Sequence, residues 1–379
     1  MPNRLNYSST HLSKQRPDFP VTGAFESILN VATGLAGLIS VVHRTLRPQM
    51  YGVTSGPEDR HRAQSLLEHY GTSAEDYFKL WPHDKAYFFS QSGHGGLAYA
   101  VHSGTAFSVG GVFGNPEKTA QVLTEFAAFC DQRHWQIAHV LLDQADLPRY
   151  TETSYKVLKL GEEAHVDLAN FGTKTVQNKH FRNVHNRFMK AGYTFEVHQP
   201  PHDAALLGAV SAVSTDWLRS THRREWKFVA GHFDYQYLDR TTLYVVKDSR
   251  HVTQAFANEI PCFVPGYASI DLMRRLQSAP SGVMDYLITE ILLHTAVQGY
   301  THFNLGLAPF SGLNGPSGST AEKLMHKFYS SPQRLLSLQG LRQFKSKFQP
   351  TWQPKYIVYT GGRRQLPRIA FALGRLLEV

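Results

Sequence analysis

The chain has 379 residues, of which 42% are hydrophobic and 18% are charged; this composition is typical of globular proteins and excludes a disordered one. Its formal net charge of +9 predicts attraction to polyanions, chiefly nucleic acid or anionic membrane surfaces. The two cysteines, Cys130 and Cys262, exclude a disulfide framework and a cysteine-ligated zinc site, and they fit a reducing cytosolic location.

The first 56 residues precede the parts of the chain that predict α/β structure. Residues 1–20 are polar and are expected to form a disordered tail. Within residues 21–56, Ser27–Val42 is uncharged and apolar, but it is shorter than the roughly 20 residues that span a bilayer. Arg44 and Arg47 follow it, as basic residues do on the cytoplasmic side of a membrane helix. The segment is therefore either a membrane-associated helix with a linker or an ordinary helix packed on the domain.

Residues 57–160 predict a first α/β unit. Periodicity favours helices at 59–70 and 118–133. Short apolar runs favour strands at 86–90, 97–102, 106–109 and 137–142. This unit contains neither paired carboxylates nor a nucleophile beside a base, so we expect no catalytic residue in it.

Residues 161–379 predict a second α/β unit that opens with a basic helix at 173–191. Helical spacing places Phe181, Val184, Phe188 and Met189 on a core-facing arc. The opposite arc carries four cations, which indicate either a phosphate-binding surface or an ordinary solvated face; they are Lys179, Arg182, Arg187 and Lys190.

Further elements of the second unit follow from the same patterns. We expect helices at 204–219 and 284–297, with Asp285 capping the second of them. We expect strands at 243–247, 251–256, 262–269, 303–305 and 356–359.

The stretch from Gly266 to Arg275 places charged side chains among apolar ones, notably Asp271 and Arg274. In a regular strand these two side chains would point to opposite faces, whereas in a helical turn they would lie side by side. A carboxylate and a guanidinium held close together bind and polarise a polar substrate, or else form a structural ion pair.

A second stretch alternates cations with aromatic residues. Its cations are Arg342, Lys345 and Lys347. Phe344, Phe348 and Trp352 lie between and after them. This pattern predicts a phosphate-binding segment whose aromatic residues belong to the core, with surface basic residues as the alternative.

Several longer motifs occur together in a characteristic order. They are Lys159-Leu-Gly-Glu-Glu-Ala164, Asn186-Arg187, Ser269-Ile-Asp-Leu-Met-Arg274, Gly282-Val-Met-Asp285, Phe303-Asn-Leu-Gly-Leu-Ala-Pro309 and the run from Gln339 to Trp352. Over roughly residues 80–359 the chain resembles the catalytic domain of bacterial aminoacyl-phosphatidylglycerol synthases, the phosphatidylglycerol lysyltransferases and alanyltransferases also called multiple peptide resistance factors.

The resemblance implies two tandem acetyltransferase-like (GNAT-like) α/β domains with mixed sheets, here residues 57–160 and 161–379. It implies transfer of lysine or alanine from aminoacyl-tRNA to the glycerol hydroxyl of phosphatidylglycerol, at the cytoplasmic face of the membrane. The product lipid is less anionic, which confers resistance to antimicrobial peptides. The multi-helix flippase of the family is missing from this sequence, in which only Ser27–Val42 resembles its last helix, so we expect either a fragment or a short form that does transfer only. The chain also has Asn115 where Asp is common in the family, and it lacks a Gly-Phe pair at 151–155.

Aminoacyl-tRNA is already an activated ester, so the implied reaction needs no ATP, metal or acetyl-CoA, and we expect no cofactor. The sequence accordingly contains no phosphate-binding Gly-x-x-x-x-Gly-Lys-Ser/Thr loop and no acetyl-CoA loop of the Gln/Arg-x-x-Gly-x-Gly/Ala type. The reaction needs a group that orients or deprotonates the lipid hydroxyl, donors for the oxyanion, and cations for two phosphate-bearing substrates.

The resemblance assigns candidate roles to the residues singled out above. Asp271 would act on the hydroxyl or hold the ammonium of the amino acid, and Arg274 would bind phosphate. Glu322 would bind the α-ammonium, unless it merely starts a helix, and Lys345 would complete the catalytic group. The remaining cations would bind the phosphates of the substrates; they are Arg342, Lys347, Arg182, Arg187 and Lys190.

Two other functions stay open from the sequence. The same fold could transfer an amino acid to another acceptor, namely a peptidoglycan peptide, diacylglycerol or a sterol. Alternatively, the basic surface could make the protein a non-enzymatic module that binds RNA or a membrane.

Overall fold

The computed structural model describes residues 55–151, 155–221, 224–312, 340–362 and 365–377. The predicted tail, the apolar segment Ser27–Val42 and Glu322 lie outside these residues. All described residues belong to one compact unit that begins at Met50. Within this part of the chain, no helix is both long enough and apolar enough to cross a membrane.

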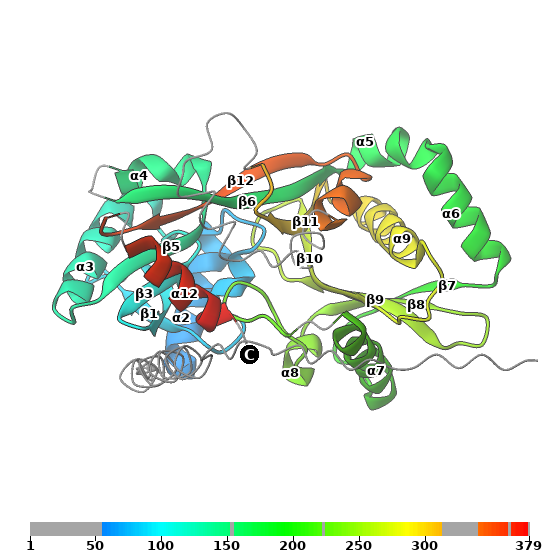
Figure 1. Cartoon of the computed structure of the whole chain (residues 1–379), viewed down its shortest axis with the longest axis horizontal. Coiled ribbons are helices and arrows are strands. Elements are labelled where there is room, and N and C mark those ends of the chain that lie inside the picture. The colour runs from blue at the N-terminus through cyan, green and yellow to red at the C-terminus, as the bar shows by residue number, and fades with distance from the viewer. Residues whose placement is uncertain (1–54, 152–154, 222–223, 313–339, 363–364, 378–379) are drawn as a thin grey trace, which may run out of the picture. The chain divides into compact units, whose positions relative to one another are not determined.

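One mixed sheet of twelve strands runs through the described residues (Figure 1). The strands follow the spatial order β1-β2-β3-β5-β12-β6-β11-β10-β9-β8-β7, and β4 pairs with β2 outside this path. Most neighbouring strands are antiparallel, but β3–β5 and β10–β11 are parallel. The predicted α/β class with a mixed sheet is therefore confirmed.

The strands of the first half are β1 (Ala86–Phe89), β2 (Gly95–His102), β3 (Thr105–Val109), β4 (Phe113–Gly114) and β5 (Gln136–Asp143). Those that follow are β6 (Lys156–Asp167), β7 (Thr194–His198), β8 (Thr242–Lys247), β9 (Thr253–Ile260), β10 (Tyr267–Arg275), β11 (His302–Pro309) and β12 (Thr351–Tyr359). The strand predicted at 262–269 begins five residues later and extends through Arg275, so it contains both Asp271 and Arg274.

Two strands in the middle of the sheet connect its two halves. β6, which the sequence patterns did not predict, contains the expected domain boundary between residues 160 and 161. β12 pairs with β5 on one side and with β6 on the other. The sheet is thus continuous across the boundary, and the division into two acetyltransferase-like domains stays a prediction.

Helices cover both faces of the sheet (Figure 1). Their bounds are α2 (Pro57–Tyr70), α3 (Thr119–Asp131), α4 (Leu147–Thr151), α5 (Leu168–Thr173), α6 (Lys179–Lys190), α7 (Ala204–Thr221), α8 (Tyr235–Leu238), α9 (Val283–Val297) and α12 (Leu366–Leu377). A short helical segment also occupies residues 340–346, and the 3₁₀ helix η1 covers Asp76–Lys79. Helices α5, α6 and α9 pack into one hydrophobic cluster, whereas α7 and α8 belong to another.

The predicted opening helix at 173–191 is shorter than expected. Asp167 accepts a hydrogen bond from the backbone N–H of Asn170 at 2.9 Å and so caps α5, which ends at Thr173. A 3₁₀ turn separates α5 from α6. Along α6, Phe181 is buried as expected, but Met189 is 54% exposed, so its predicted place in the core is wrong.

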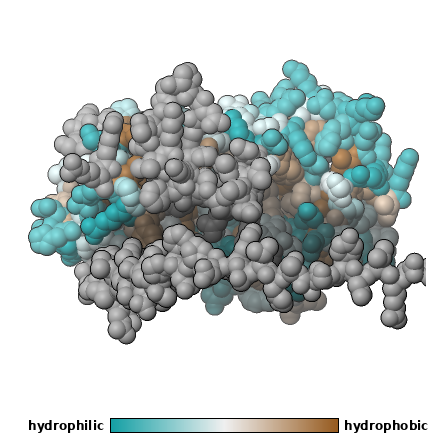
Figure 2. All heavy atoms as spheres, in the orientation of Figure 1, coloured by the Kyte–Doolittle hydropathy of each residue, from teal (hydrophilic) through white to brown (hydrophobic). Residues whose placement is uncertain are grey.

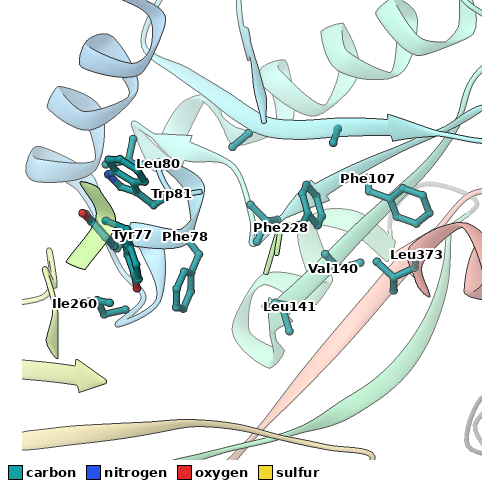
Figure 3. Packing of buried hydrophobic residues seen from close by; sticks show 14 of the residues in the cluster. Tyr77, Phe78, Leu80, Trp81, Phe107, Val140, Leu141, Phe228, Ile260 and Leu373 are labelled. Atoms are coloured by element: carbon teal, nitrogen blue, oxygen red, sulfur yellow. The ribbon is translucent and has the colours of Figure 1, made fainter. Parts of the chain in front are cut away.

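A single hydrophobic cluster contains residues from both halves of the chain. Figure 3 shows Tyr77, Phe78 and Trp81, from the segment around η1, grouped near Ile260 at the end of β9. Leu272 of β10 belongs to the same cluster. Burial of this apolar surface fixes the segment around η1 against the second half of the sheet.

Candidate functional site

The sheet opens between its two central parallel strands. Within the described residues, β10 and β11 pair over three positions, from Tyr267 opposite His302 to Ser269 opposite Asn304. Beyond this point β10 continues against β9 and β11 continues against β6. The candidate catalytic residues lie at this split, because Asp271 follows Ser269 on β10 and Lys345 contacts the part of β11 beyond Asn304.

Asp271 is held by two donors on the β10 side of the split. The hydroxyl of Tyr237 donates a hydrogen bond to Oδ2 at 2.6 Å, and the backbone N–H of Gly231 donates another. A Cβ at position 231 would overlap this carboxylate, so the close approach requires glycine. Burial raises the pKa of Asp271 to about 6, although the Tyr237 hydrogen bond and the charge of Arg274 act in the opposite direction.

A β-bulge decides how Asp271 and Arg274 are arranged. Between Ile270 and Met273, β10 contains one more residue than the facing segment of β9. The extra residue shifts the alternation of side chains, so Asp271 and Arg274 both face the side of α7 and α8. The expectation of opposite faces for a strand is therefore wrong here.

The guanidinium of Arg274 is buried and binds a carboxylate and a hydroxyl. It forms a two-pronged ion pair with Glu225, with N–O distances of 2.7 and 2.5 Å. It also hydrogen-bonds to Ser214 and lies 5.2 Å from the centre of the Trp217 ring. Because both terminal nitrogens of Arg274 already bind protein groups, this residue is arranged to hold β10 and to stabilise the charge on Asp271.

Lys345 lies on the β11 side of the split. Its Nζ donates hydrogen bonds to the carbonyl oxygens of Gly306 and Leu307, both at 2.9 Å, and the residue is 2% exposed. Gly306 adopts φ +80°, a conformation that favours glycine and accompanies the irregular pairing of β11 with β6. Burial lowers the pKa of Lys345 to about 8, although the nearby carboxyl groups of Glu75 and Glu163 act in the opposite direction.

A buried charge network lies beneath this part of β11. Lys355 of β12 forms ion pairs with Asp143 at 2.9 Å and with Glu163 of β6 at 3.3 Å. Burial alone would raise the pKa of Glu163, but the charge of Lys355 and a hydrogen bond from His165 hold that pKa at about 2. Burial alone would lower the pKa of Lys355, but its two carboxylate partners raise it well above the usual range.

The other cations of the 342–352 segment point to different partners. Arg342 pairs with Glu162 and lies 4.1 Å from the centre of the Trp352 ring. Lys347 binds both oxygens of Asp285, at 2.8 and 3.0 Å. The expected cap by Asp285 is therefore wrong, since Gly282 occupies the N-cap of α9.

The basic arc of α6 faces outward. Lys179, Arg182 and Lys190 are exposed, and none of them forms an ion pair within the described ranges. Arg187 differs, because its guanidinium donates to the carbonyl oxygen of Ser281. In Figure 2 hydrophilic residues gather at the upper right, where Figure 1 places α6. The structure thus leaves three of the four predicted cations accessible to a polyanion.

Sequence patterns missed several residues of the site. Tyr237 and Glu225 complete the surroundings of Asp271 and Arg274, yet each lies in a segment without a recognisable motif. Glu163 and Lys355 are charged residues in β6 and β12, and a charged residue in a sequence is normally expected at the surface, so their burial was not predicted. The one signal available for Glu163 was its place in the motif Lys159–Ala164, which contributed to the family resemblance but did not mark Glu163 as a site residue.

Comparisons with known proteins show the family of the chain. The family model described as "Phosphatidylglycerol lysyltransferase, C-terminal" matches residues 64–359. A phosphatidylglycerol lysyltransferase of Bacillus subtilis (strain 168) is 31% identical over 338 residues, which are 89% of this chain and 38% of that protein. One from Staphylococcus xylosus is 28% identical over 297 residues, which are 78% of this chain and 35% of that protein.

Among solved structures, L-PGS from Bacillus licheniformis superimposes with a TM-score of 0.74 at 31% identity, covering 87% of this chain and 98% of that one. The chain spans little more than a third of the length of the two lysyltransferases. The matched residues include both sides of the split and the network beneath it. The chain therefore belongs to the phosphatidylglycerol lysyltransferase C-terminal family.

Proposed function

We propose that the protein is an aminoacyltransferase that moves an amino acid from aminoacyl-tRNA to the glycerol hydroxyl of phosphatidylglycerol at the cytoplasmic face of a membrane. The names of its relatives support transfer of lysine. The observation that carries the proposal is the Asp271 carboxylate, held by Tyr237 and Gly231 at the opening of the sheet. Such a group, with a pKa near 6, is ionised at neutral pH and able to accept a proton.

The proposed reaction exchanges one ester for another. The lipid hydroxyl oxygen bonds to the ester carbonyl carbon, and its proton passes to Asp271. The bond from that carbon to the ribose oxygen of the tRNA then breaks, and the leaving oxygen receives a proton from the Lys345 ammonium on the other side of the split. Tyr237 keeps the carboxylate oriented, because burial and the charge of Asp271 raise the pKa of Tyr237 well above its usual value and keep it a donor.

Arg274 has a supporting role in this proposal. Its ion pair with Glu225 argues against direct binding of phosphate. We therefore assign Arg274 the role of stabilising the negative charge of Asp271. Phosphates of the tRNA would instead meet the exposed cations of α6, namely Lys179, Arg182 and Lys190. Glu322, as a ligand of the α-ammonium, stays a prediction from the resemblance.

A direct transfer assay tests the function. The full chain is mixed with phosphatidylglycerol vesicles and tRNA charged separately with labelled lysine or alanine, and label is counted in the extracted lipid. We expect label from the lysyl donor, because the curated relatives are lysyltransferases. Label from alanine would reassign the donor. If the protein is folded and no donor labels the lipid, phosphatidylglycerol is rejected as the acceptor and another acceptor is favoured.

Charge reversal on α6 tests the RNA surface. The double variant Arg182→Glu/Lys190→Glu should weaken binding of tRNA and reduce the slope of log Kd against log salt by roughly two, about one for each lost phosphate contact. Arg219→Glu, at a residue 79% exposed on α7, is the control and should change the slope little. An unchanged slope in the double variant would mean that α6 is only a solvated face.

A further inference from the structure

The segment around η1, from Glu75 to Trp81, contacts both sides of the split, although it belongs to the half in which the sequence predicted no site residue. On the β10 side, the Tyr77 and Trp81 rings lie 6.3 and 5.9 Å from the ring of Tyr237, the partner of Asp271. On the β11 side, the Glu75 carboxyl accepts a hydrogen bond from Asn304 Nδ2 at 3.4 Å. The first half of the chain is thus built into the candidate site.

Glu75 and Glu163 meet at Asn304. The same amide nitrogen donates to Glu75 Oε1 and, at 3.3 Å, to Glu163 Oε2, while the amide oxygen accepts from the backbone N–H of Gly306 at 2.8 Å. The two carboxyl groups therefore meet at one amide nitrogen. Two ionised carboxylates held this close in the interior would repel each other, which favours a state in which one of them is protonated.

The surroundings decide which one carries the proton. Glu163 is 1% exposed and faces the positive charge of Lys355 and the ring of His165, which favour its ionised form. Glu75 forms no ion pair within the described residues, although the charges of Lys355 and Lys345 lie near enough to act against a raised pKa. Burial and the charge of Glu163 accordingly raise the pKa of Glu75 well above its usual value.

We propose that Glu75 is a positioning residue of the transfer site: it stays protonated at neutral pH, donates its proton to Glu163, and leaves one negative charge beneath β11. This inference deepens the proposed function and rests on it for the role of Lys345. With Glu75 neutral, Glu163 is the carboxylate that stabilises Lys345; Glu163 is itself paired with Lys355 and bound to His165, and Asp143 balances Lys355. The Lys345 ammonium then has one carboxylate to stabilise it instead of two, while burial favours its neutral form, so it can give up a proton.

The first test needs no catalysis. A carboxyl that is protonated when folded and ionised when unfolded takes up a proton on folding, which costs stability as pH rises above the unfolded pKa of about 4.3. Glu75→Gln carries no such proton and keeps a similar shape. The Tm of the Gln variant minus that of the wild type should therefore increase from pH 5 to pH 7.5. Glu68→Gln, at an exposed residue of α2, should show no comparable rise.

A Tm difference between Glu75→Gln and the wild type that does not change with pH would overturn the proposal. A Glu75 that is ionised in both the folded and the unfolded protein takes up no proton on folding, so its removal would not change the pH dependence of stability. This result does not depend on whether the protein transfers an amino acid. Failure of the proposed function is therefore distinguishable from failure of this inference.

The second test uses the pH profile of transfer. The alkaline limb of kcat, which we assign to Lys345, should stay in place in Glu75→Gln, because a neutral group replaces a neutral group. In Glu163→Gln it should move to lower pH by about one unit, since an attractive charge is lost. Glu75→Ala should lower kcat, and Gln should restore it. An acid shift of the limb in Glu75→Gln would show that Glu75 is ionised and would refute the proposal.

Discussion

Replacing Asp271 with Asn is expected to reduce kcat for transfer by about 10²–10⁴-fold, the usual contribution of a general base. The amide keeps the shape of the side chain, and Tyr237 still has an oxygen to which it can donate. The protein should therefore remain folded, with an unchanged thermal melting profile. Transfer of labelled amino acid to lipid, measured with saturating donor, gives the effect.

The pH dependence of the wild type follows from the same group. Asp271 acts in its ionised form, and burial places its pKa at about 6, so activity should fall as pH decreases through 6. Tyr237→Phe removes a hydrogen bond that lowers this pKa, and the acid limb should move to higher pH. Asp131→Asn, at an exposed position at the end of α3, is the matched control and should change neither kcat nor the limb. Full activity in Asp271→Asn would remove this residue from the mechanism.

Replacing Lys355 with Met should destabilise the protein by about 3–5 kcal/mol, the cost of leaving a buried charge without its partner. Glu163 is 1% exposed and would lose its main ion pair, whereas Asp143 is 35% exposed and can turn to water. Urea unfolding should show the loss as a lower midpoint at a similar slope. Lys156→Met, at an exposed position on β6, is the control and should stay within about 0.5 kcal/mol of the wild type.

A double variant separates charge from packing. If the unpaired carboxylate of Glu163 is the cause, Lys355→Met/Glu163→Gln should recover part of the lost stability, because no buried charge remains without a partner. Additive losses in the two single variants would instead mean that the two residues contribute independently.

Hydrophobic periodicity was sufficient for most of the helices and strands, since α3, α7, α9, β3 and β8 lie close to the predicted ranges. Hydrophobic periodicity did not predict the strand in which charged residues are buried. Glu162 and Glu163 interrupt the apolar pattern of β6, so that strand was not predicted, yet Lys355 and Arg342 neutralise both carboxylates in three dimensions. Pairing partners from distant segments are not visible in a local pattern.

The candidate site shows the same limit. Asp271 was found from its position among apolar residues, but its relation to Arg274 depends on a bulge that spacing does not reveal. The alternative of a structural ion pair describes Arg274 in part, with Glu225 rather than Asp271 as the partner. Met189 was misplaced because α6 ends one residue later, at the edge of its buried face. Glu75 lies in a half without motifs, and only the fold brings it to Asn304.

The position of β12 has a consequence for biosynthesis. It is the last strand of the described chain, yet it lies between β5 and β6, near the middle of the sheet. While the ribosome still holds residues beyond 350, β5 and β6 each have an edge with unpaired backbone groups, and Lys355 is not yet available to Glu163. The two parts of the sheet can therefore join only after β12 has left the ribosome, and until then the unpaired edges of β5 and β6 are open to wrong pairing.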